Sequence, residues 1–543
     1  MRVPRGRTVA VTSAVAVLVV GAAAGGAYYV LHTRGTPQET AQRFTAAWTR
    51  GDLAAMKAEL ATPSPGFDAA YAELTKNLGA TGVAVSGLRV SAPVNDRATA
   101  AYSATATLKN VGDWTYQGEL KLMVKDHYWK VDWSPQAVHP ALTGAEHLAL
   151  KTSWPQRAAI TDANGDRIDG GDVGGSVQQL VGYLDKATAK DVKRLGAAYH
   201  VGDTVGAGEG LQQTFQKQLA GTPTTEIQVV GSEKKTLHTI EGSPGKDVRT
   251  SLDLRVQRAA ADAVRDLKKI ASLVAIRPSS GEILAVANNQ GGFNRALAGQ
   301  YPPGSTFKTI TAAGLLAEGL SPSDKVSCPA KANVGGLDIR NSDHESFGSL
   351  TFLDSYAHSC NTTFAPLAAS KLGARKLYDL ATGFGFNQPL NIGVSAAKGS
   401  MPKATSDAEL ASEAFGQARI LASPLVMATV AAAVADGSWR PPTLVPDLKQ
   451  NASPKELPSG VAEPLRQMMR AVVTKGTAHA AGLPSGTAGK TGTAEFVSNS
   501  KIETHAWFIG FRGDLAFAVV VEAGGMGGEV AAPVAAHFLK SLS

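Results

Sequence analysis

The chain has 543 residues, which at about 150 residues per domain suggests three or four domains. Hydrophobic residues make up 44% and charged residues 18%, a globular composition that excludes a coiled-coil rod, a collagen and a wholly disordered chain. Two cysteines cannot build a zinc-finger array or a thiolate-bound iron–sulfur cluster. The net charge is +7, and the basic residues form no stripe, so nucleic-acid binding is not expected.

An uncharged, largely apolar stretch runs from Thr8 to Thr33, and the seven residues before it include three arginines. Crossing the hydrocarbon core takes about 20 apolar residues, so this stretch is long enough. The arginines predict a cytoplasmic tail over residues 1–7, a transmembrane anchor over 8–31 and an extracytoplasmic remainder. A cleaved signal peptide is the alternative, but its apolar region is usually shorter, so we favour an uncleaved anchor in the cell membrane.

The next hundred residues predict a small α+β domain. Thr36-Pro37-Gln38-Glu39 has the pattern of a capping box, and Phe44, Ala47 and Trp48 follow on one helical face. A second helix is expected near 69–78. Four β-rich stretches then lie close together, as antiparallel strands do, at Gly82–Val90, Arg97–Leu108, Thr115–Lys125 and Tyr128–Trp133. No catalytic set is visible here, so the domain is read as a spacer or docking module.

Residues 140–249 have no clear period because glycine-rich runs interrupt them, and an extended, mixed linker domain is expected. Gly210–Leu219 has a helical pattern. From residue 250 the pattern strengthens: Ser251-Leu-Asp253 should cap a helix, and two short apolar strands flank a turn. Helices occupy the middle, and late strands precede a helix near Pro533–Leu542. This order predicts an α/β sandwich with helices packed on an antiparallel sheet.

Ser-x-x-Lys occurs six times in the chain, so the string alone carries little information. Only the copy at Ser305 and Lys308 opens an apolar helical run. Positions three apart share a helix face, so Lys308 can reach the Ser305 hydroxyl at a helix amino terminus, which favours developing negative charge. A serine becomes a good nucleophile when a base takes its proton. Lys308 must be neutral to do so, and burial and a second cation both lower a lysine pKa.

Lys490 is a candidate for that second cation, because it stands in the chain's only Lys-Thr-Gly. The small residues there would let a substrate backbone lie against a strand edge. Between the two elements lies Ser359-Cys360-Asn361, whose hydroxyl can pass a proton and whose amide can hold Lys308 and a substrate carbonyl. Each element alone is more often a cap, a turn or a loop. The three together, outside a membrane anchor, favour a catalytic site.

These three elements resemble the active-site set of the penicillin-recognising serine acyltransferases. Further segments resemble the class B penicillin-binding proteins, namely Asn294-Arg-Ala296, Thr250–Gln257, Phe415-Gly-Gln417, Ser423-Pro-Leu425 and Ala506–Gly510. The domain ending in Tyr128–Trp133 resembles the NTF2-like amino-terminal domain of one class B subgroup. The resemblance implies a multidomain α+β chain, with an NTF2-like domain over 36–137, a linker or dimerisation domain over 140–249 and a serine β-lactamase-like transpeptidase domain over 250–543.

The resemblance also implies a reaction, which is D,D-transpeptidation of peptidoglycan stem peptides with carboxypeptidation as a side activity. Ser305 would attack the D-Ala–D-Ala carbonyl with Lys308 as base, Ser359 would relay a proton to the leaving amine, and Asn361 would hold the substrate amide. Lys490-Thr491-Gly492-Thr493 would bind the terminal carboxylate, and the backbone N–H groups of Ser305 and Thr493 would form the oxyanion hole.

The same resemblance implies acylation of Ser305 by β-lactams, a polytopic glycan polymerase as partner, and no metal or organic cofactor. Two other functions stay open. One is a serine β-lactamase or β-lactam sensor, against which the long upstream region and the anchor argue. The other is an inactive cell-wall scaffold, against which the intact Ser305, Lys308 and Lys490 argue.

Two positions depart from the family pattern. Ala418 follows Gly416-Gln417 where the family usually has another glycine, and Cys360 stands in the middle of the Ser-x-Asn element. Cys328 and Cys360 both lie outside the membrane, where a disulfide is permitted. The sequence leaves open a bridge or two buried thiols, and we favour the thiols slightly.

Overall fold

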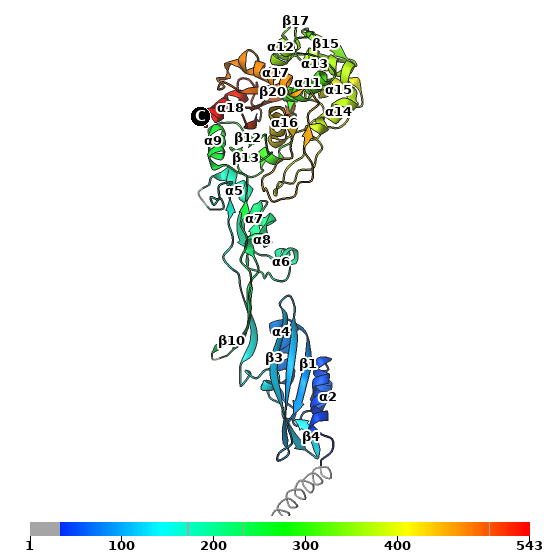
Figure 1. The fold of residues 1–543 in the computed structure, drawn as a ribbon, viewed down its shortest axis with the longest axis vertical. Coiled ribbons are helices and arrows are strands. Elements are labelled where there is room, and N and C mark those ends of the chain that lie inside the picture. Colours follow the sequence, from blue (N-terminus) through cyan, green and yellow to red (C-terminus); the bar gives the residue numbers. More distant parts are fainter. Residues whose placement is uncertain (1–32, 171–172, 232, 499) are drawn as a thin grey trace, which may run out of the picture. The chain divides into compact units, whose positions relative to one another are not determined.

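The computed structural model describes residues 33–170, 173–231, 233–498 and 500–543 (Figure 1). The predicted tail and the predicted anchor over 8–31 lie outside the described residues. Within the described ranges, no helix combines the length and the apolarity needed to cross a membrane.

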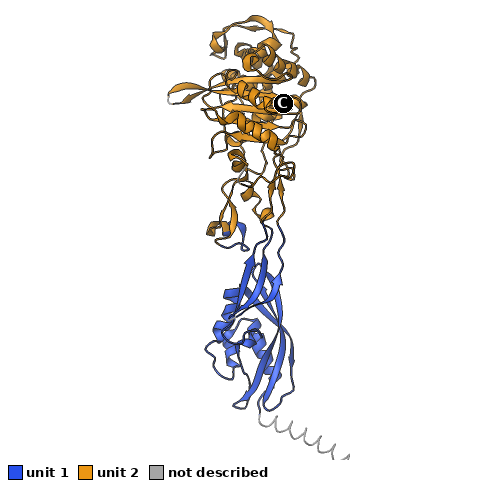
Figure 2. Ribbon diagram, turned by 90° about the vertical axis from the view of Figure 1, so that its left-hand side faces the viewer, with its two compact units in different colours: residues 1–156, 192–200, 221–244 blue, residues 157–191, 201–220, 245–543 orange. Residues whose placement is uncertain are grey.

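The chain divides into two compact units, which are coloured in Figure 2. The first contains the described residues up to Gln156 with 192–200 and 221–244, and the second contains 157–191, 201–220 and 245–543, apart from the undescribed positions. The segment 140–249, expected as one linker domain, therefore contributes to both units.

The first unit packs helices on a four-stranded antiparallel sheet of order β1-β2-β3-β4. Its elements are α2 (Pro37–Thr49), α3 (Leu53–Ala58), α4 (Phe67–Leu78), β1 (Ala80–Val90), β2 (Arg97–Leu108), β3 (Gly112–Lys125), β4 (Tyr128–Val131) and the 3₁₀ turn η1 (Pro135–Ala137). The capping box is present, because Thr36 Oγ1 accepts from the Glu39 N–H and Glu39 Oε2 accepts from the Thr36 N–H. The predicted helical face of α2 is buried against the sheet, and β2 alternates buried and exposed residues along its first half.

Residues 147–249 form short elements, some of which belong to the first unit and some to the second. They are β5 (His147–Ser153), β6 (Ile160–Thr161), α5 (Gly175–Val181), β7 (Tyr183–Lys186), α6 (Ala189–Leu195), β8 (Thr204–Ala207), α7 (Leu211–Thr214), α8 (Gln216–Ala220), β9 (Thr224–Val230), β10 (Lys234–Ile240) and β11 (Val248–Arg249). The strands pair in the order β10-β9-β5, and β7 with β8 and β6 with β11 form two-stranded sheets. The single helix predicted over 210–219 is two short helices that meet at Phe215.

The second unit is built on a five-stranded antiparallel sheet of order β13-β12-β22-β21-β20. The strands are β12 (Ala271–Ile276), β13 (Ile283–Asn288), β20 (Ala488–Ser498), β21 (Lys501–Phe511) and β22 (Ala516–Val521). Every residue of β12 and β22 is buried, which explains why these strands are apolar on both faces, apart from Ser272, instead of alternating. The predicted sandwich of helices on an antiparallel sheet is confirmed.

Helices α9 (Leu254–Arg265) and α18 (Ala531–Lys540) pack on this sheet and on each other, and α16 (Pro424–Asp436) packs on β12, β21 and β22. The remaining elements of the second unit lie between β13 and β20 in the sequence. They are α10 (Arg295–Ala298), η2 (Gly304–Phe307), α11 (Lys308–Ala317), β14 (Lys325–Cys328), β15 (Lys331–Val334), β16 (Leu337–Arg340), η3 (Ser342–His344), β17 (Gly348–Thr351), α12 (Phe352–Ala357), α13 (Asn361–Leu367), the π-helical turn η4 (Ala368–Leu372), α14 (Gly373–Gly383), α15 (Asp407–Glu413), β18 (Ser438–Trp439), β19 (Lys455–Glu456), α17 (Ala462–Thr474) and η5 (His479–Ala481).

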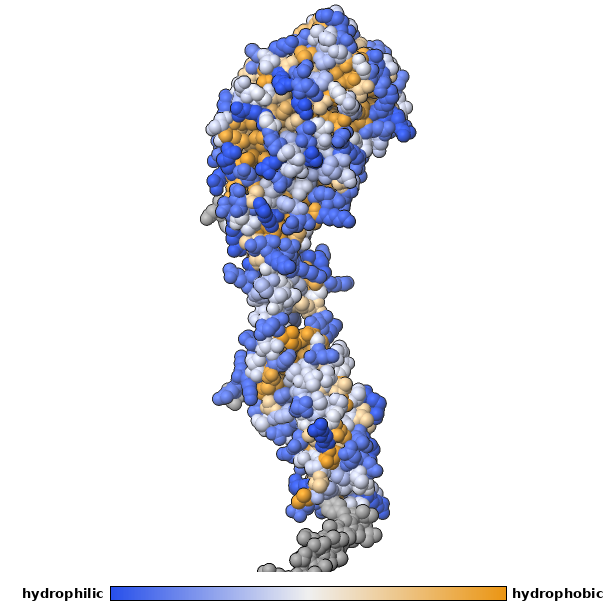
Figure 3. All heavy atoms as spheres, in the orientation of Figure 1, coloured by the Kyte–Doolittle hydropathy of each residue, from blue (hydrophilic) through white to orange (hydrophobic). Residues whose placement is uncertain are grey.

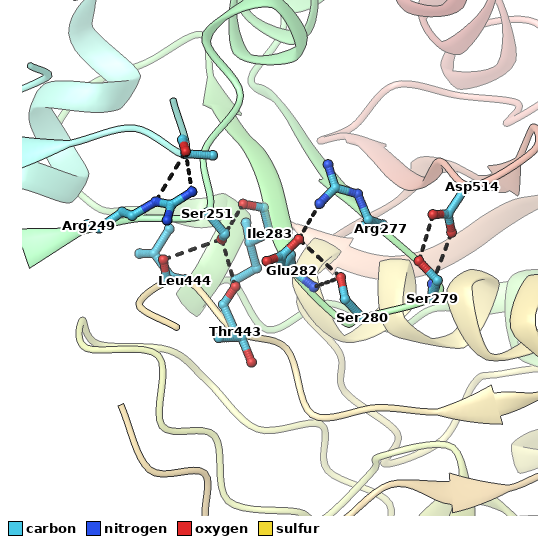
Figure 4. A network of polar contacts seen from close by, with 11 residues as sticks. Arg249, Ser251, Arg277, Ser279, Ser280, Glu282, Ile283, Thr443, Leu444 and Asp514 are labelled. Carbon is cyan, nitrogen blue, oxygen red and sulfur yellow. Dashed lines mark hydrogen bonds and ion pairs between the residues drawn. The ribbon is translucent and has the colours of Figure 1, made fainter. Parts of the chain in front are cut away.

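Polar contacts hold the segment that leads into α9, and Figure 4 shows those of Ser251. Asp253 caps the helix by accepting from two backbone N–H groups. The Ser251 hydroxyl instead lies 2.8 Å from the carbonyl oxygens of Ile283 and Thr443. It therefore fastens the segment before α9 to β13 and to the chain after α16. On the face of the second unit seen in Figure 3, hydrophilic side chains dominate and hydrophobic ones form scattered patches.

Candidate active site

Ser305 and Lys308 lie at the junction of η2 and α11, where a 3₁₀ turn passes into an α-helix. The predicted helix is present, but its α-helical part begins only at Lys308. Gly304 has a φ of +55°, and a Cβ there would lie 2.8 Å from the carbonyl oxygen of Thr493. Glycine is therefore required both by the left-handed backbone and by the close approach of the turn to β20.

Lys308 is fully buried, and its ammonium nitrogen lies among four oxygen atoms. Nζ is 3.1 Å from Ser305 Oγ, 3.2 Å from Ser359 Oγ, 2.6 Å from the Ser359 carbonyl oxygen and 2.6 Å from Asn361 Oδ1. Burial, and then the charge of Lys490, hold the pKa of Lys308 well below its ordinary value. This places a lysine that readily loses its proton within hydrogen-bond distance of the serine hydroxyl.

Ser359 stands in the short connection between α12 and α13, and Asn361 is the first residue of α13. Ser359 has a φ of +61°, an uncommon conformation for a residue with a side chain. Asn361 Oδ1 accepts from Lys308, and Nδ2 donates to the Arg340 carbonyl oxygen at 2.8 Å. These two hydrogen bonds fix the orientation of the Asn361 side chain. The amide nitrogen carries two hydrogens, so one N–H of Asn361 is left to donate to another acceptor.

Lys490 is also fully buried, and its Nζ lies 2.9 Å from Ser359 Oγ and 2.9 Å from the Thr491 carbonyl oxygen. Burial lowers the pKa of Lys490 to about 7. Ser359 Oγ therefore lies between two lysine nitrogens that are separated by at most about 6 Å, where like charges still repel appreciably. Lys490, which the sequence predicts as a second cation beside Lys308, does lie beside it.

Thr491, Gly492 and Thr493 lie on β20, which is an edge strand of the sheet. Thr491 Oγ1 is 2.5 Å from Thr477 Oγ1, and Thr493 Oγ1 accepts from the Gly527 N–H at 3.2 Å. A Cβ at Gly492 would lie 2.8 Å from a methyl carbon of Thr306, so a larger residue would push β20 away from the Ser305 turn. The strand edge thus lies directly beside the turn that carries Ser305.

Two aromatic residues near the lysines were not singled out from the sequence. The Phe364 ring centroid is 5.8 Å from Lys308 Nζ, and the Tyr356 centroid is 5.6 Å from Lys490 Nζ. Both rings are buried, and each offers its electron-rich system to an ammonium group withdrawn from water. Both residues lie within three positions of Ser359–Asn361 in the sequence, and this nearness was the one sequence feature that could have pointed to them.

Cys328 and Cys360 form a disulfide, so the expectation of two buried thiols is wrong. Their Cα atoms are 6.0 Å apart although 32 positions separate them in sequence. The strand β14 folds against α13, where Thr363 Oγ1 donates to the Ser327 carbonyl oxygen at 2.7 Å. This tertiary contact, which sequence separation does not reveal, brings the sulfurs together. The bridge anchors the residue between Ser359 and Asn361.

The segment around Gly416 supports the nucleophile turn. The Gly304 N–H donates to the Gly416 carbonyl oxygen at 2.9 Å, and a Cβ at Gly416 would lie 2.0 Å from the Gly304 carbonyl oxygen. Gly416 has a φ of +77° and Ala418 one of +62°. The backbone therefore keeps, at Ala418, the left-handed conformation that a glycine would adopt more easily.

Three family models match the chain in consecutive segments. They are the penicillin binding protein transpeptidase domain at residues 271–540, the NTF2-like N-terminal transpeptidase domain at 36–146 and the penicillin-binding protein dimerisation domain at 173–250. A peptidoglycan D,D-transpeptidase, PbpA of Mycolicibacterium smegmatis, is 31% identical over 389 residues, which are 60% of this chain and 77% of that protein.

The chain belongs to the class B penicillin-binding proteins. Among solved structures of this family, it resembles Pseudomonas aeruginosa PBP2 in complex with WCK 5153, with a TM-score of 0.60, 26% identity and coverage of 72% of this chain and 96% of that one. It also resembles the ceftriaxone acyl-enzyme of penicillin-binding protein A from M. tuberculosis, with a TM-score of 0.50, 26% identity and coverage of 55% and 80%. The class B resemblance and the NTF2-like domain inferred from the sequence are confirmed.

Proposed function

We propose that the protein is a peptidoglycan D,D-transpeptidase that works through an acyl-enzyme on Ser305. One observation carries the proposal: Ser305 Oγ lies 3.1 Å from Nζ of Lys308, a fully buried lysine whose pKa is lowered by burial and by a second buried lysine. The kinship with PbpA and with a β-lactam acyl-enzyme supports the same reaction class.

In the acylation step, neutral Lys308 takes the proton of Ser305 while Oγ attacks the carbonyl carbon of the penultimate D-Ala. The negative charge that develops on the carbonyl oxygen is stabilised by the backbone N–H groups of Ser305 and Thr493. The contact of the Gly304 turn with Thr493 supports this assignment, because it brings the two backbone segments together. Oxyanion stabilisation of this kind is usually the largest single contribution to acyl-transfer catalysis.

Departure of the terminal D-Ala requires a proton on its amine. Ser359 is suited to deliver it, since its hydroxyl touches both Lys308 and Lys490. Lys490 in its protonated form, with Thr491, Gly492 and Thr493 on the strand edge, binds the terminal carboxylate, and Asn361 holds the substrate amide. The amine of a second stem peptide then attacks the acyl-enzyme, which frees Ser305 and leaves a cross-link. With water as the acceptor, the same intermediate gives carboxypeptidation.

A fluorescent penicillin tests this proposal. We expect the full-length protein to form a long-lived adduct that is lost in Ser305→Ala and retained in Ser400→Ala, a matched change in another Ser-x-x-Lys string. Rapid turnover of the adduct would favour the serine β-lactamase or sensor alternative. No adduct from a folded wild-type protein would favour the inactive scaffold. A purified cross-linked dimer of stem peptides would complete the case for transpeptidation.

We also propose that residues 8–31 anchor the protein in the cell membrane with the catalytic domain outside, in company with a polytopic glycan polymerase. The proposal rests on the apolar run and the arginines before it, and on the family's cell-wall substrate. Protease added to intact spheroplasts should remove the catalytic domain and leave a membrane-bound remnant. Release of full activity into the soluble fraction would contradict the anchor.

A further inference from the structure

A groove outside the active site follows helix α5 in the second unit. It consists of two cavities of about 560 and 650 Å³, and Gln179 and Gly292 line both of them. The first cavity lies between α5, α9 and the end of β13, and the second lies between the start of β7 and the residues before α10. Each has the size of a site for a small organic ligand, and together they suit an elongated one.

Two exposed aromatic side chains stand at the second cavity. Tyr183 is 59% exposed and Phe293 is 55% exposed, which is unusual for side chains of this size. The Tyr183 ring rests on Gly208, where a Cβ would lie 2.7 Å from a ring carbon. The Phe293 ring has the Arg295 guanidinium carbon 5.9 Å from its centroid. Each ring is thus supported by a neighbour and keeps apolar surface in solvent.

Polar groups without partners accompany the rings. Among the described residues, the Glu209 carboxylate and the Ser395 hydroxyl, which line this cavity, make no side-chain hydrogen bond or ion pair. Asn294 accepts through Oδ1 from the Asn288 side chain and the Leu297 N–H. Within the same described ranges, its Nδ2 group donates to nothing. Beside its two aromatic rings the cavity therefore offers the Asn294 amide, the Ser395 hydroxyl and the Glu209 carboxylate, and Gln178 and Gln179 line it as well.

We propose that this groove binds a chain of N-acetylated amino sugars, the glycan that carries the stem peptides. The proposal rests on the proposed function, which makes a glycan-borne peptide the substrate. A pyranose ring has a C–H face that packs on an aromatic ring and a rim of hydroxyl and acetamido groups that need donors and acceptors. An apolar peptide would leave the Asn294 amide unpaired. Arg258, Asp262 and Arg265 line the first cavity and Glu209 lines the second, so the charges of the groove balance and suit an uncharged ligand better than a phosphate backbone.

A chain of contacts connects the groove with the nucleophile. Arg295, beside Phe293, donates through Nε to Glu522 Oε1 at 3.0 Å, and the same oxygen accepts from the Tyr301 hydroxyl at 2.6 Å. Tyr301 stands three residues before Gly304 and pairs through its backbone with Ala422. A glycan held on Phe293 would therefore be bound to the same rigid framework as Ser305, which would raise the local concentration of its stem peptides.

Binding of the β-1,4-linked hexamer of N-acetylglucosamine to the full-length protein tests the proposal by calorimetry. We expect Tyr183→Ala and Phe293→Ala each to weaken binding about tenfold, equivalent to about 1.4 kcal/mol. Tyr128→Ala, which alters a 45% exposed tyrosine of the first unit, should leave the affinity unchanged. Acylation by fluorescent penicillin should be normal in all three variants, which also verifies their folding.

Failure of the hexamer to bind the wild type, or equal affinity in Tyr183→Ala and wild type, would overturn the glycan site. Equal binding of the glucose hexamer would overturn recognition of the acetamido groups. These outcomes are separable from failure of the proposed function. A protein that binds the hexamer through Tyr183 but forms no penicillin adduct would retain the glycan site and lose the transpeptidase.

Discussion

Replacing Lys490 with methionine should change the pH at which Lys308 becomes an effective base. Ser359 Oγ is 3.2 Å from one lysine nitrogen and 2.9 Å from the other, so the two nitrogens are at most about 6 Å apart. At an effective dielectric constant of about 20, two unit charges at that separation repel by about 2.7 kcal/mol, which corresponds to about two pH units.

The sign follows from the charge of Lys490. Lys490 keeps its proton up to a pKa of about 7, and its charge adds to burial in holding the pKa of Lys308 well below its ordinary value. Without that charge Lys308 retains its proton to a higher pH, because burial alone then opposes protonation. The acid limb of the acylation rate should therefore move upward by as much as about two pH units in Lys490→Met.

The assay is the first-order acylation constant at saturating fluorescent penicillin, measured from about pH 5 to pH 10. Saturation separates this effect from the weaker binding of the penicillin carboxylate. Thr491→Val, which removes a neighbouring hydroxyl but no charge, should keep the wild-type acid limb. An acid limb of Lys490→Met at the wild-type pH, or below it, would refute Lys308 as the base under the influence of Lys490.

Three further predictions concern stability. Reduction of Cys328–Cys360 should lower the melting temperature of the second unit by about 5 °C, because a loop of this length contributes about 3.7 kcal/mol and roughly 350 residues unfold together. Calorimetry with and without reductant measures this shift, and a Cys328→Ser/Cys360→Ser variant should not respond to reductant. Ala418→Gly should raise the melting temperature by about 1–2 °C by relieving a φ of +62°, whereas no change would mean that the position is unstrained. Both carboxylate oxygens of Glu413 are buried without a partner, and burial, then Glu409, raise its pKa to about 7. The folded state thus binds a proton that the unfolded state releases, so stability should fall as the pH rises from about 4.5 to above 7, and thermal scans of Glu413→Gln should lose that dependence.

The parts of the fold that could be predicted depend on neighbours in sequence. The capping box at Thr36 and Glu39 and the pairing of Ser305 with Lys308 both follow from a helical period of three to four residues. The sheet of the second unit could be anticipated because its buried strands are short apolar runs between turn residues. Local chemistry alone specifies such features, and these predictions are confirmed.

The features that could not be predicted from the sequence depend on contacts between segments far apart in the chain. Ser359 meets Lys308 from 51 positions away and Lys490 from 131 positions away. The residue types and the family resemblance suggested that these groups meet, but no local rule specifies it. The disulfide of Cys360 was misjudged for the same reason. Ser251 looks like a helix cap, but the tertiary structure offers it two carbonyl oxygens and leaves the capping to Asp253.

The pair of buried lysines, Lys308 and Lys490, explains why the short loop at Ser359 and Cys360 is held by several hydrogen bonds and a disulfide. Withdrawing two ammonium groups from water costs stability, and in the proposed mechanism the cost persists because the same burial makes Lys308 a base. The carbonyl oxygens of Ser359 and Thr491 and the amide of Asn361 offset part of it, but only while the loop keeps its left-handed turn. The disulfide holds that loop at its centre, at Cys360. In the proposed mechanism, reactivity at Ser305 is thus maintained by fixing in place a destabilising cluster, because a looser fold would hydrate Lys308 and leave it protonated.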